Sequence, residues 1–233
     1  FHTQTAGCSL TAQQPENNIA RTGFQALAGV LGGTQSLHTN SMDETLALPT
    51  EKAAEIALRT QQLIAYETGV SNVVDPLGGS WYIEKLTDDI EQKAEEYFAE
   101  IEALGGVVPA IEQGFFQREI AKSASDYQNK VDEGKRIVVG VNKFVKDNEE
   151  IDIPILEIGS EAGQDQLKKL SDLKKDRNNK NVEDAISKIR KACKEETNLM
   201  YPIIDAAKKY VTLGEIVDAL KGEFGEWQES AVF

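Results

Sequence analysis

Cysteine is scarce in this sequence: Cys8 and Cys193 are the only two among 233 residues. Two cysteines so far apart form no disulfide framework and lack the spacing of a metal site. We therefore expect two reduced thiols, a cytoplasmic protein and no metal held by this chain itself. Nucleophile motifs, Walker loops and zinc spacings are absent as well.

Long apolar runs and positive charge are also in short supply. No run approaches the roughly 20 residues that a membrane span needs, and the chain opens without a secretory signal pattern. Against 39 Asp and Glu stand 25 Lys and Arg, a net charge of −14. Binding to nucleic acid requires clustered Lys and Arg, so we expect neither nucleic acid nor a membrane as a partner.

Two stretches near the start share one pattern, a short strand that runs out into a polar loop. The first predicts a strand over residues 1–5, with His2 and Gln4 on one face. The second, residues 33–44, carries most of the candidate polar side chains: Gln35, His38, Asn40, Asp43 and Glu44. A predicted helix joins them. This order is typical of neighbouring strands in a parallel sheet, whose ligand site lies beyond the carboxyl ends of the strands.

Helical periodicity dominates the remaining sequence. The joining helix is predicted from Pro15 to Leu31, with Ile19, Phe24 and Leu27 on its apolar face. Further helices are predicted over 51–67, 86–104 and 108–133, the last interrupted at Gly114, and again between residues 164 and 224. The apolar face of the helix over 51–67 is predicted to be Ala54, Ala57, Leu58 and Ile64, with Gln61 and Gln62 on solvated surface. Residues 137–142 are typical of a short buried strand.

The absence of an initiator Met, and a start inside an expected strand, predict the carboxyl-terminal portion of a longer protein.

The polar residues have two interpretations, which the residues alone leave open. His2 can be a hydrogen-bonded histidine at a strand end, or a ligand contact paired with Gln4. Asn40, Asp43 and Glu44 can form an Asx-turn and a capped helix start. They can equally bind a polyhydroxylated ligand, because a carboxylate accepts hydrogen bonds from ribose hydroxyls and an amide both donates and accepts them.

Several longer motifs carry a resemblance to a known family. They are HTQTAG at 2–7, LTAQQPENN at 10–18, GGTQSLHTNSMDE at 32–44, ALPTEKAAEIALRTQQ at 47–62, DPLGGSWYIE at 75–84 and GVNKF at 140–144. In this order they resemble the large (alpha) subunit of methylmalonyl-CoA mutase and its relatives, over nearly the whole chain. The resemblance implies an α/β fold: the C-terminal portion of a TIM (β/α)8 barrel, its last strands, over residues 1–134. A linker strand and a mainly helical C-terminal extension would follow over 135–233.

The resemblance also implies an activity, that of an adenosylcobalamin-dependent radical isomerase that interconverts methylmalonyl-CoA and succinyl-CoA. In the family, cobalt–carbon homolysis gives a 5′-deoxyadenosyl radical, which abstracts a hydrogen before a group migrates within the acyl chain. His2 and Gln35 match residues near the substrate. Gln4, Asn40 and Glu44 match residues at the adenosyl group, and Ala47 matches a backbone contact to the cofactor. The family's cobalamin motif, Asp-x-His-x-x-Gly, is absent, so the cobalt ligand is expected from another domain or subunit.

The substrate stays open at this point, because the family's carboxylate-binding Tyr and Arg lie upstream of the matched part. Cys8 stands where many methylmalonyl-specific members have Trp, and TAQQPENN and ALRTQQLIAYETG also resemble isobutyryl-CoA and 2-hydroxyisobutyryl-CoA mutases. The alternative of another class is a non-catalytic, barrel-derived binding subunit. The implied partners are an acyl-CoA substrate, the remaining N-terminal barrel segment and a separate cobalamin-binding subunit, in a dimer or heterotetramer.

Overall fold

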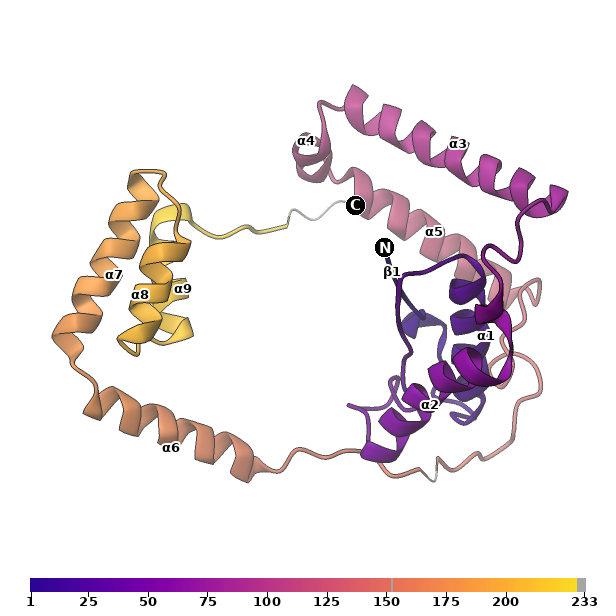
Figure 1. Cartoon of the computed structure of the whole chain (residues 1–233), viewed down its shortest axis with the longest axis horizontal. Helices are drawn as coiled ribbons and strands as arrows, with labels where there is room; N and C mark the ends of the chain where they lie inside the picture. The colour runs from indigo at the N-terminus through magenta and orange to yellow at the C-terminus, as the bar shows by residue number, and fades with distance from the viewer. Residues whose placement is uncertain (152, 230–233) are drawn as a thin grey trace. The chain divides into compact units, whose positions relative to one another are not determined.

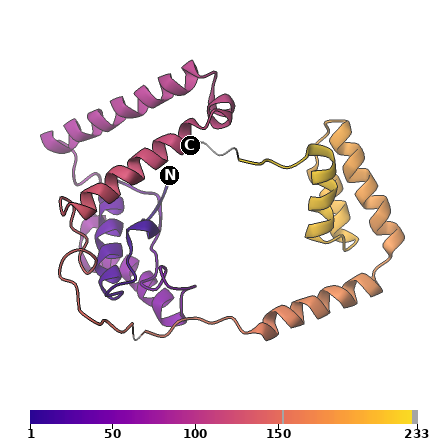
Figure 2. The same cartoon turned by 180° about the vertical axis from the view of Figure 1, so that it is seen from behind.

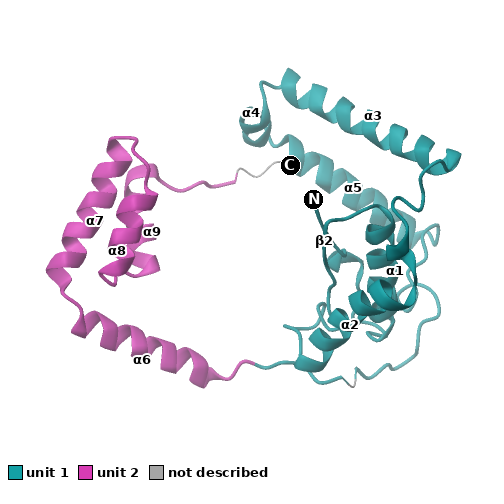
Figure 3. Cartoon of the chain, in the orientation of Figure 1, with its two compact units in different colours: residues 1–157, 232–233 teal, residues 158–231 magenta. Residues whose placement is uncertain are grey.

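The computed structural model of the chain describes residues 1–151 and 153–229. They form two compact units, the first over residues 1–157 and the second from Ile158 onward (Figure 3). The described residues are mainly helical, with one small parallel sheet. Within these residues, no helix combines the length and apolarity that crossing a membrane would need.

The first unit begins with a strand–helix–strand arrangement (Figure 1). Strand β1 (His2–Gln4) is followed by a short 3-10 turn, η1 (Gly7–Ser9), helix α1 (Asn17–Leu31) and strand β2 (Ser36–His38). The two strands pair in parallel, with Gln4 opposite His38. The predicted parallel pairing is therefore confirmed, although each strand is only three residues long.

Helix α1 packs on one face of this sheet. A Cβ atom at Gly29 would lie 3.1 Å from Thr3 Cγ2 and 3.8 Å from Leu37 Cδ1, so the glycine allows the helix to approach the strands closely. Side chains alternate along a strand. His2, Gln4, Ser36 and His38 consequently lie on the opposite face, where they are exposed.

The predicted apolar face of α1 is wrong at Phe24, whereas Ile19 and Leu27 are half-buried. The residues of α1 that are buried are Asn18, Thr22 and Ala26, whereas Phe24 is 75% exposed. The large apolar side chains set the prediction, but small and polar side chains face the strands and the loop after β2. Close approach of the helix to the sheet favours the smaller side chains on that face.

Helix α2 (Glu51–Glu67) has the predicted bounds, and Thr50 caps it by accepting a hydrogen bond from the amide of Ala53 at 3.2 Å. Its buried face consists of Ala53, Ala57, Thr60 and Ile64. Ala57 and Ile64 were predicted correctly for this face. Ala54 and Leu58 are instead exposed, because α1 contacts a side of α2 one position away from the predicted stripe.

Beyond the turn η2 (Val70–Asn72) lie three more helices of the first unit, α3 (Trp81–Ala103), α4 (Val107–Glu112) and α5 (Phe115–Asp132). The predicted break at Gly114 is confirmed, and this glycine has a left-handed φ of 69°. Helices α3 and α5 run side by side in both views (Figures 1 and 2), joined by a ring contact between Tyr97 and Phe115. Neither helix has a buried residue.

The predicted buried strand over residues 137–142 is wrong. Ile137 is 51% exposed, and the amides of Val141 and Asn142 both donate to the carbonyl of Val138, at 3.0 and 3.2 Å. These short-range bonds close a turn. A run of β-branched residues does not form a strand unless a neighbouring strand supplies partners for its backbone.

The second unit contains α6 (Ser160–Asp176), α7 (Asn179–Lys194), α8 (Met200–Lys208) and α9 (Leu213–Phe224), so the helices predicted between residues 164 and 224 are confirmed. Helices α7, α8 and α9 pack around a small core: Val182, Ala185, Ile189, Cys193, Ala206, Val211, Ile216 and Ala219. Thr212 and Glu215 form a capping box that begins α9.

Candidate functional site

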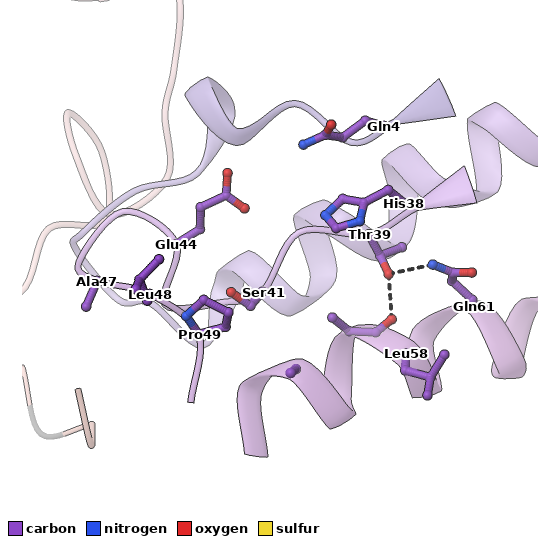
Figure 4. Close-up of a pocket in the computed structure, with 12 residues that line it drawn as sticks. Gln4, His38, Thr39, Ser41, Glu44, Ala47, Leu48, Pro49, Leu58 and Gln61 are labelled. Carbon is purple, nitrogen blue, oxygen red and sulfur yellow. Dashed lines mark hydrogen bonds between the residues drawn. The ribbon is translucent and has the colours of Figure 1, made fainter. Parts of the chain in front are cut away.

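A pocket of about 570 Å³ lies beyond the carboxyl ends of β1 and β2 (Figure 4). Three parts of the chain supply its walls: the last residues of the strands, the loop after β2, and the exposed side of α2. The lining residues are Gln4, His38, Thr39, Ser41, Glu44, Ala47, Leu48, Pro49, Ala54, Ala57, Leu58 and Gln61. This is the edge at which the sequence predicts a ligand site.

Asn40 joins the ends of the two strands beneath the pocket. It is 2% exposed. Its backbone amide donates to Thr5 Oγ1 and its side-chain Nδ2 donates to the Thr5 carbonyl, both at 2.9 Å. The amide Nε2 of Gln4 donates to Asn40 Oδ1 at 3.1 Å. Because Gln4 uses its nitrogen here, its carbonyl oxygen is available to accept a hydrogen bond from a ligand.

Thr39 and Gln61 connect β2 to α2. Thr39 Oγ1 donates to the carbonyl of Ala57 at 2.6 Å, and Gln61 Nε2 donates to Thr39 Oγ1 at 3.0 Å and to the Leu37 carbonyl at 3.2 Å. The prediction that Gln61 lies on solvated surface is wrong. A signal was present in the sequence, since Gln61 continues the helical face of Ala54, Ala57 and Leu58.

Asp43 organises the loop that carries Glu44 and Ala47. It is wholly buried, and its Oδ2 accepts hydrogen bonds from the amide of Thr50 at 3.0 Å and from Thr50 Oγ1 at 3.3 Å. The amide of Ala47 donates to the Asp43 carbonyl at 3.1 Å, which closes a turn. A further buried amide, Asn18 Nδ2, donates to the carbonyl of Met42 at 2.9 Å. The loop is therefore held from α1 and from the start of α2.

Glu44 is the carboxylate that this loop presents to the pocket. Its side chain is exposed, and within residues 1–151 and 153–229 it accepts no hydrogen bond. Figure 4 shows Glu44, Gln4 and His38 extending from separate segments around the same open space. Leu48, Pro49 and Leu58 contribute an apolar wall. A carboxylate and an amide oxygen beside such a wall can bind a ligand that has both hydroxyl groups and an apolar ring.

His2 and Gln35 lie outside the lining of this pocket. His2 Nδ1 is 2.7 Å from Ser36 Oγ, on the sheet face that also bears Gln4. Gln35 precedes β2, and its Oε1 accepts a hydrogen bond from the Phe1 amino group. His38, one of the candidate polar side chains of residues 33–44, is part of the lining. The structure thus brings together Gln4, Asn40, Glu44 and Ala47, and the roles of His2 and Gln35 stay predictions.

The described residues contain no group of three or more His, Cys, Asp or Glu arranged to hold a metal ion. Over the same part of the chain, Cys8 is exposed, Cys193 is buried, and both are free thiols.

Comparisons with known proteins give one consistent result. The sequence model of the family described as methylmalonyl-CoA mutase matches residues 1–226. The "2-hydroxyisobutanoyl-CoA mutase large subunit" of Aquincola tertiaricarbonis is 43% identical over 100% of this chain. The methylmalonyl-CoA mutases of Rhizobium meliloti and Escherichia coli are each 42% identical over 97% of it. The matched parts are 42%, 32% and 32% of these three relatives, so the chain spans less than half of their length.

Proposed function

The chain belongs to the methylmalonyl-CoA mutase family, and we propose that it forms the C-terminal part of the catalytic barrel in an adenosylcobalamin-dependent acyl-CoA mutase. Residues 1–134 would supply the last strands and helices of the (β/α)8 barrel, and residues 135–233 its C-terminal extension. The observation that carries the proposal is the pocket at the ends of β1 and β2, which Gln4 and Glu44 line and where the buried Asn40 accepts a hydrogen bond from Gln4.

The pocket residues fit an adenosyl group. The volume of about 570 Å³ lies within the range of small-molecule sites. The Glu44 carboxylate has free acceptor oxygens for two ribose hydroxyls, and the carbonyl oxygen of Gln4 can accept a further hydrogen bond. Leu48, Pro49 and Leu58 can pack against the purine. Ala47 would contact the cofactor through its backbone.

Adenosylcobalamin, when bound, supplies the radical that abstracts a hydrogen atom from the acyl group. The residues of this chain bind and orient the adenosyl group, and the apolar wall of the pocket excludes water from it. Asn40 keeps the Gln4 amide in place, and Asp43 keeps the loop of Glu44 in place. The cobalt ligand would come from another domain or subunit.

His2 and Gln35 are proposed to act on the substrate. His2 shares a sheet face with Gln4 and lies two residues before it, roughly 7 Å along the strand. A substrate stacked against the adenosyl group along that face would therefore reach His2. Gln35 lies just before the first residue of β2, Ser36, which pairs with His2, and it is proposed to contact the acyl-CoA from there.

The proposed reaction is the interconversion of methylmalonyl-CoA and succinyl-CoA. A second candidate, rearrangement of 2-hydroxyisobutyryl-CoA or isobutyryl-CoA, is favoured by the relative from Aquincola tertiaricarbonis, which matches the whole of this chain. The name "large subunit" of that relative also supports a separate cobalamin-binding subunit as a partner, together with the remaining N-terminal barrel segment. A non-catalytic role is disfavoured because Gln4 and Glu44 still present acceptor oxygens to the pocket.

A coupled assay tests the proposal. The full-length protein that contains this chain is combined with its cobalamin-binding partner and adenosylcobalamin. Each of the three acyl-CoA esters is then supplied in turn, and the products are separated by liquid chromatography. We expect succinyl-CoA from methylmalonyl-CoA. Product from one of the other esters alone would select the second candidate, and no product from any of the three would contradict the proposed function.

A further inference from the structure

Gly7 lies directly against the Glu44 carboxylate. It begins the turn η1, which leaves the end of β1, whereas Glu44 belongs to the loop after β2. A Cβ atom at Gly7 would lie well inside 3.0 Å of Glu44 Oε1 and 3.3 Å from Glu44 Cδ. Real Cβ atoms essentially never come that close to another heavy atom. Any residue other than glycine at this position would therefore displace the carboxylate or its surroundings.

This contact differs from the other close approaches between a glycine and a carboxylate. Cβ atoms at Gly78 and Gly159 would each lie 2.6 Å from a carboxylate oxygen, of Asp75 and Glu161 respectively. Those carboxylates belong to the same local turn as the glycine. The Gly7 contact instead joins two loops that leave different strands of the sheet.

Glu44 is the part of this contact that can move. On its other side Gly7 faces Asn40, whose Nδ2 would be 3.1 Å from an added Cβ. Asn40 is held by hydrogen bonds to Thr5 and Gln4 and is 2% exposed. The exposed Glu44 side chain has no such restraint among the described residues. An added methyl group would consequently displace the carboxylate, whereas Asn40 would have to give by only a few tenths of an ångström.

We propose that Gly7 is a positioning residue for Glu44: the missing side chain lets the carboxylate rest against the backbone of η1 and directs its oxygens into the pocket. The inference rests on the proposed function, in which Glu44 binds the adenosyl ribose. The φ angle of Gly7 lies outside the left-handed region, so its backbone conformation is open to alanine. Glycine is therefore required at this position because a side chain would occupy the space of the Glu44 carboxylate, and not because of its backbone conformation.

The test is Gly7→Ala in the full-length protein with its cobalamin-binding partner. Dissociation constants for adenosylcobalamin and hydroxocobalamin are measured by absorbance titration, since only the first carries the adenosyl group. We expect adenosylcobalamin to bind about tenfold more weakly, because a hydrogen bond to a charged group is lost. Binding of hydroxocobalamin and the melting temperature are expected to stay unchanged.

A double-mutant cycle separates positioning from general damage. If Gly7 acts through Glu44, then Gly7→Ala changes adenosylcobalamin affinity less than about twofold when Glu44→Gln is already present. Gly23→Ala is the matched control: it lies within α1, and its added Cβ would be 3.8 Å from Thr60 Cγ2, an ordinary contact. We expect this control to behave as the unmodified protein.

The possible results distinguish a failure of the positioning role of Gly7 from a failure of the proposed function. Equal affinities in Gly7→Ala and Gly23→Ala, or full additivity of Gly7→Ala with Glu44→Gln, would overturn the positioning role while the unmodified enzyme still turns over. A lower melting temperature with weaker hydroxocobalamin binding would also overturn it, since the added methyl group would then have displaced more than Glu44. If the unmodified protein isomerises no acyl-CoA ester, the proposed function fails first.

Discussion

At the scale of single residues, the proposed binding of the adenosyl group depends on one exposed carboxylate, that of Glu44. The variant Glu44→Gln keeps the shape of the side chain and removes its charge. We expect turnover by the full-length enzyme to fall by an amount on the order of 1–3 kcal/mol, the usual contribution of a hydrogen bond to a charged group. Steady-state kinetics measure this. Glu67→Gln, at the exposed last residue of α2, is the control and should leave turnover unchanged. Equal turnover in the two variants would argue against a binding role for Glu44.

Asp43 is a second single residue with a testable role, and its role is in the stability of the fold. Replacing it with alanine leaves the amide and the hydroxyl of Thr50 without their acceptor. We expect Asp43→Ala to lower the free energy of unfolding by about 2 kcal/mol or more. Urea denaturation followed by circular dichroism measures the change. Asp88→Ala on the exposed surface of α3 should change the same quantity by less than about 0.5 kcal/mol.

At the scale of secondary-structure elements, the packing of α1 on the sheet depends on Gly29. Its Cα faces Thr3 and Leu37 at distances that leave no space for a large side chain. We expect Gly29→Leu to destabilise the protein by about 1–3 kcal/mol through overpacking. Gly163→Leu in α6 is the control, because no heavy atom lies within 4 Å of a Cβ atom built there. A destabilisation of the same size in both variants would show that Gly29 does not limit the packing of α1.

In the second unit, the start of α9 is tied to the residue that follows α6. Arg177 donates to both carboxylate oxygens of Glu215, at 2.5 and 2.7 Å, and to the carbonyl of Tyr210 at 2.8 Å. The pKa of Glu215 is lowered from 4.5 to about 2, and the largest cause is the hydrogen bond from Arg177. The bonds from Thr212 act in the same direction, and burial opposes them.

This pKa predicts how the stability of the second unit depends on pH. Because the folded-state pKa of Glu215 lies below its ordinary value, the ionised carboxylate stabilises the folded state above about pH 4.5, and this contribution is lost as the pH falls to about 2. The full effect is on the order of 3 kcal/mol. Urea unfolding measured from pH 5 to pH 2 should show the loss, and Glu215→Gln should remove this part of it. An unchanged pH profile in the variant would refute the assignment.

At the scale of the whole molecule, many large apolar side chains are uncovered in this chain. Trp81 is 91% exposed, Tyr82 74% and Phe98 56%, all on α3, which has no buried residue. The chain also spans less than half of its relatives' length. In the proposed function, the remaining barrel segment and the cobalamin-binding subunit complete the enzyme.

A prediction about the isolated chain follows from this dependence. The 233-residue chain by itself is expected to bind adenosylcobalamin poorly, since the proposed function places the cobalt ligand and most of the barrel outside it. Absorbance titration of the isolated chain measures this binding, and the assembled enzyme serves as the positive control. Tight stoichiometric binding by the isolated chain would contradict the prediction.

Features that depend only on neighbouring residues could be predicted from the amino-acid sequence. Thr50 marks the start of α2 and Gly114 separates α4 from α5, because caps and left-handed glycines act within one turn of the chain. The parallel pairing of β1 and β2 followed from a helix between two short strands. The family motifs also predicted Gln4, Asn40 and Glu44 as candidate site residues, and these three lie at or next to the ends of β1 and β2.

Which side chains meet depends on how the elements pack in three dimensions, and this could not be predicted from the sequence. Packing turns Asn18 and Thr22 inward where Phe24 was predicted, and it brings Gln61 to the pocket. It also places the backbone of Gly7 against the carboxylate of Glu44. These contacts depend on the distance and angle at which separate elements pack, and helical or strand periodicity describes each element only by itself. Periodicity therefore identified the elements, and packing selected the faces that form the site.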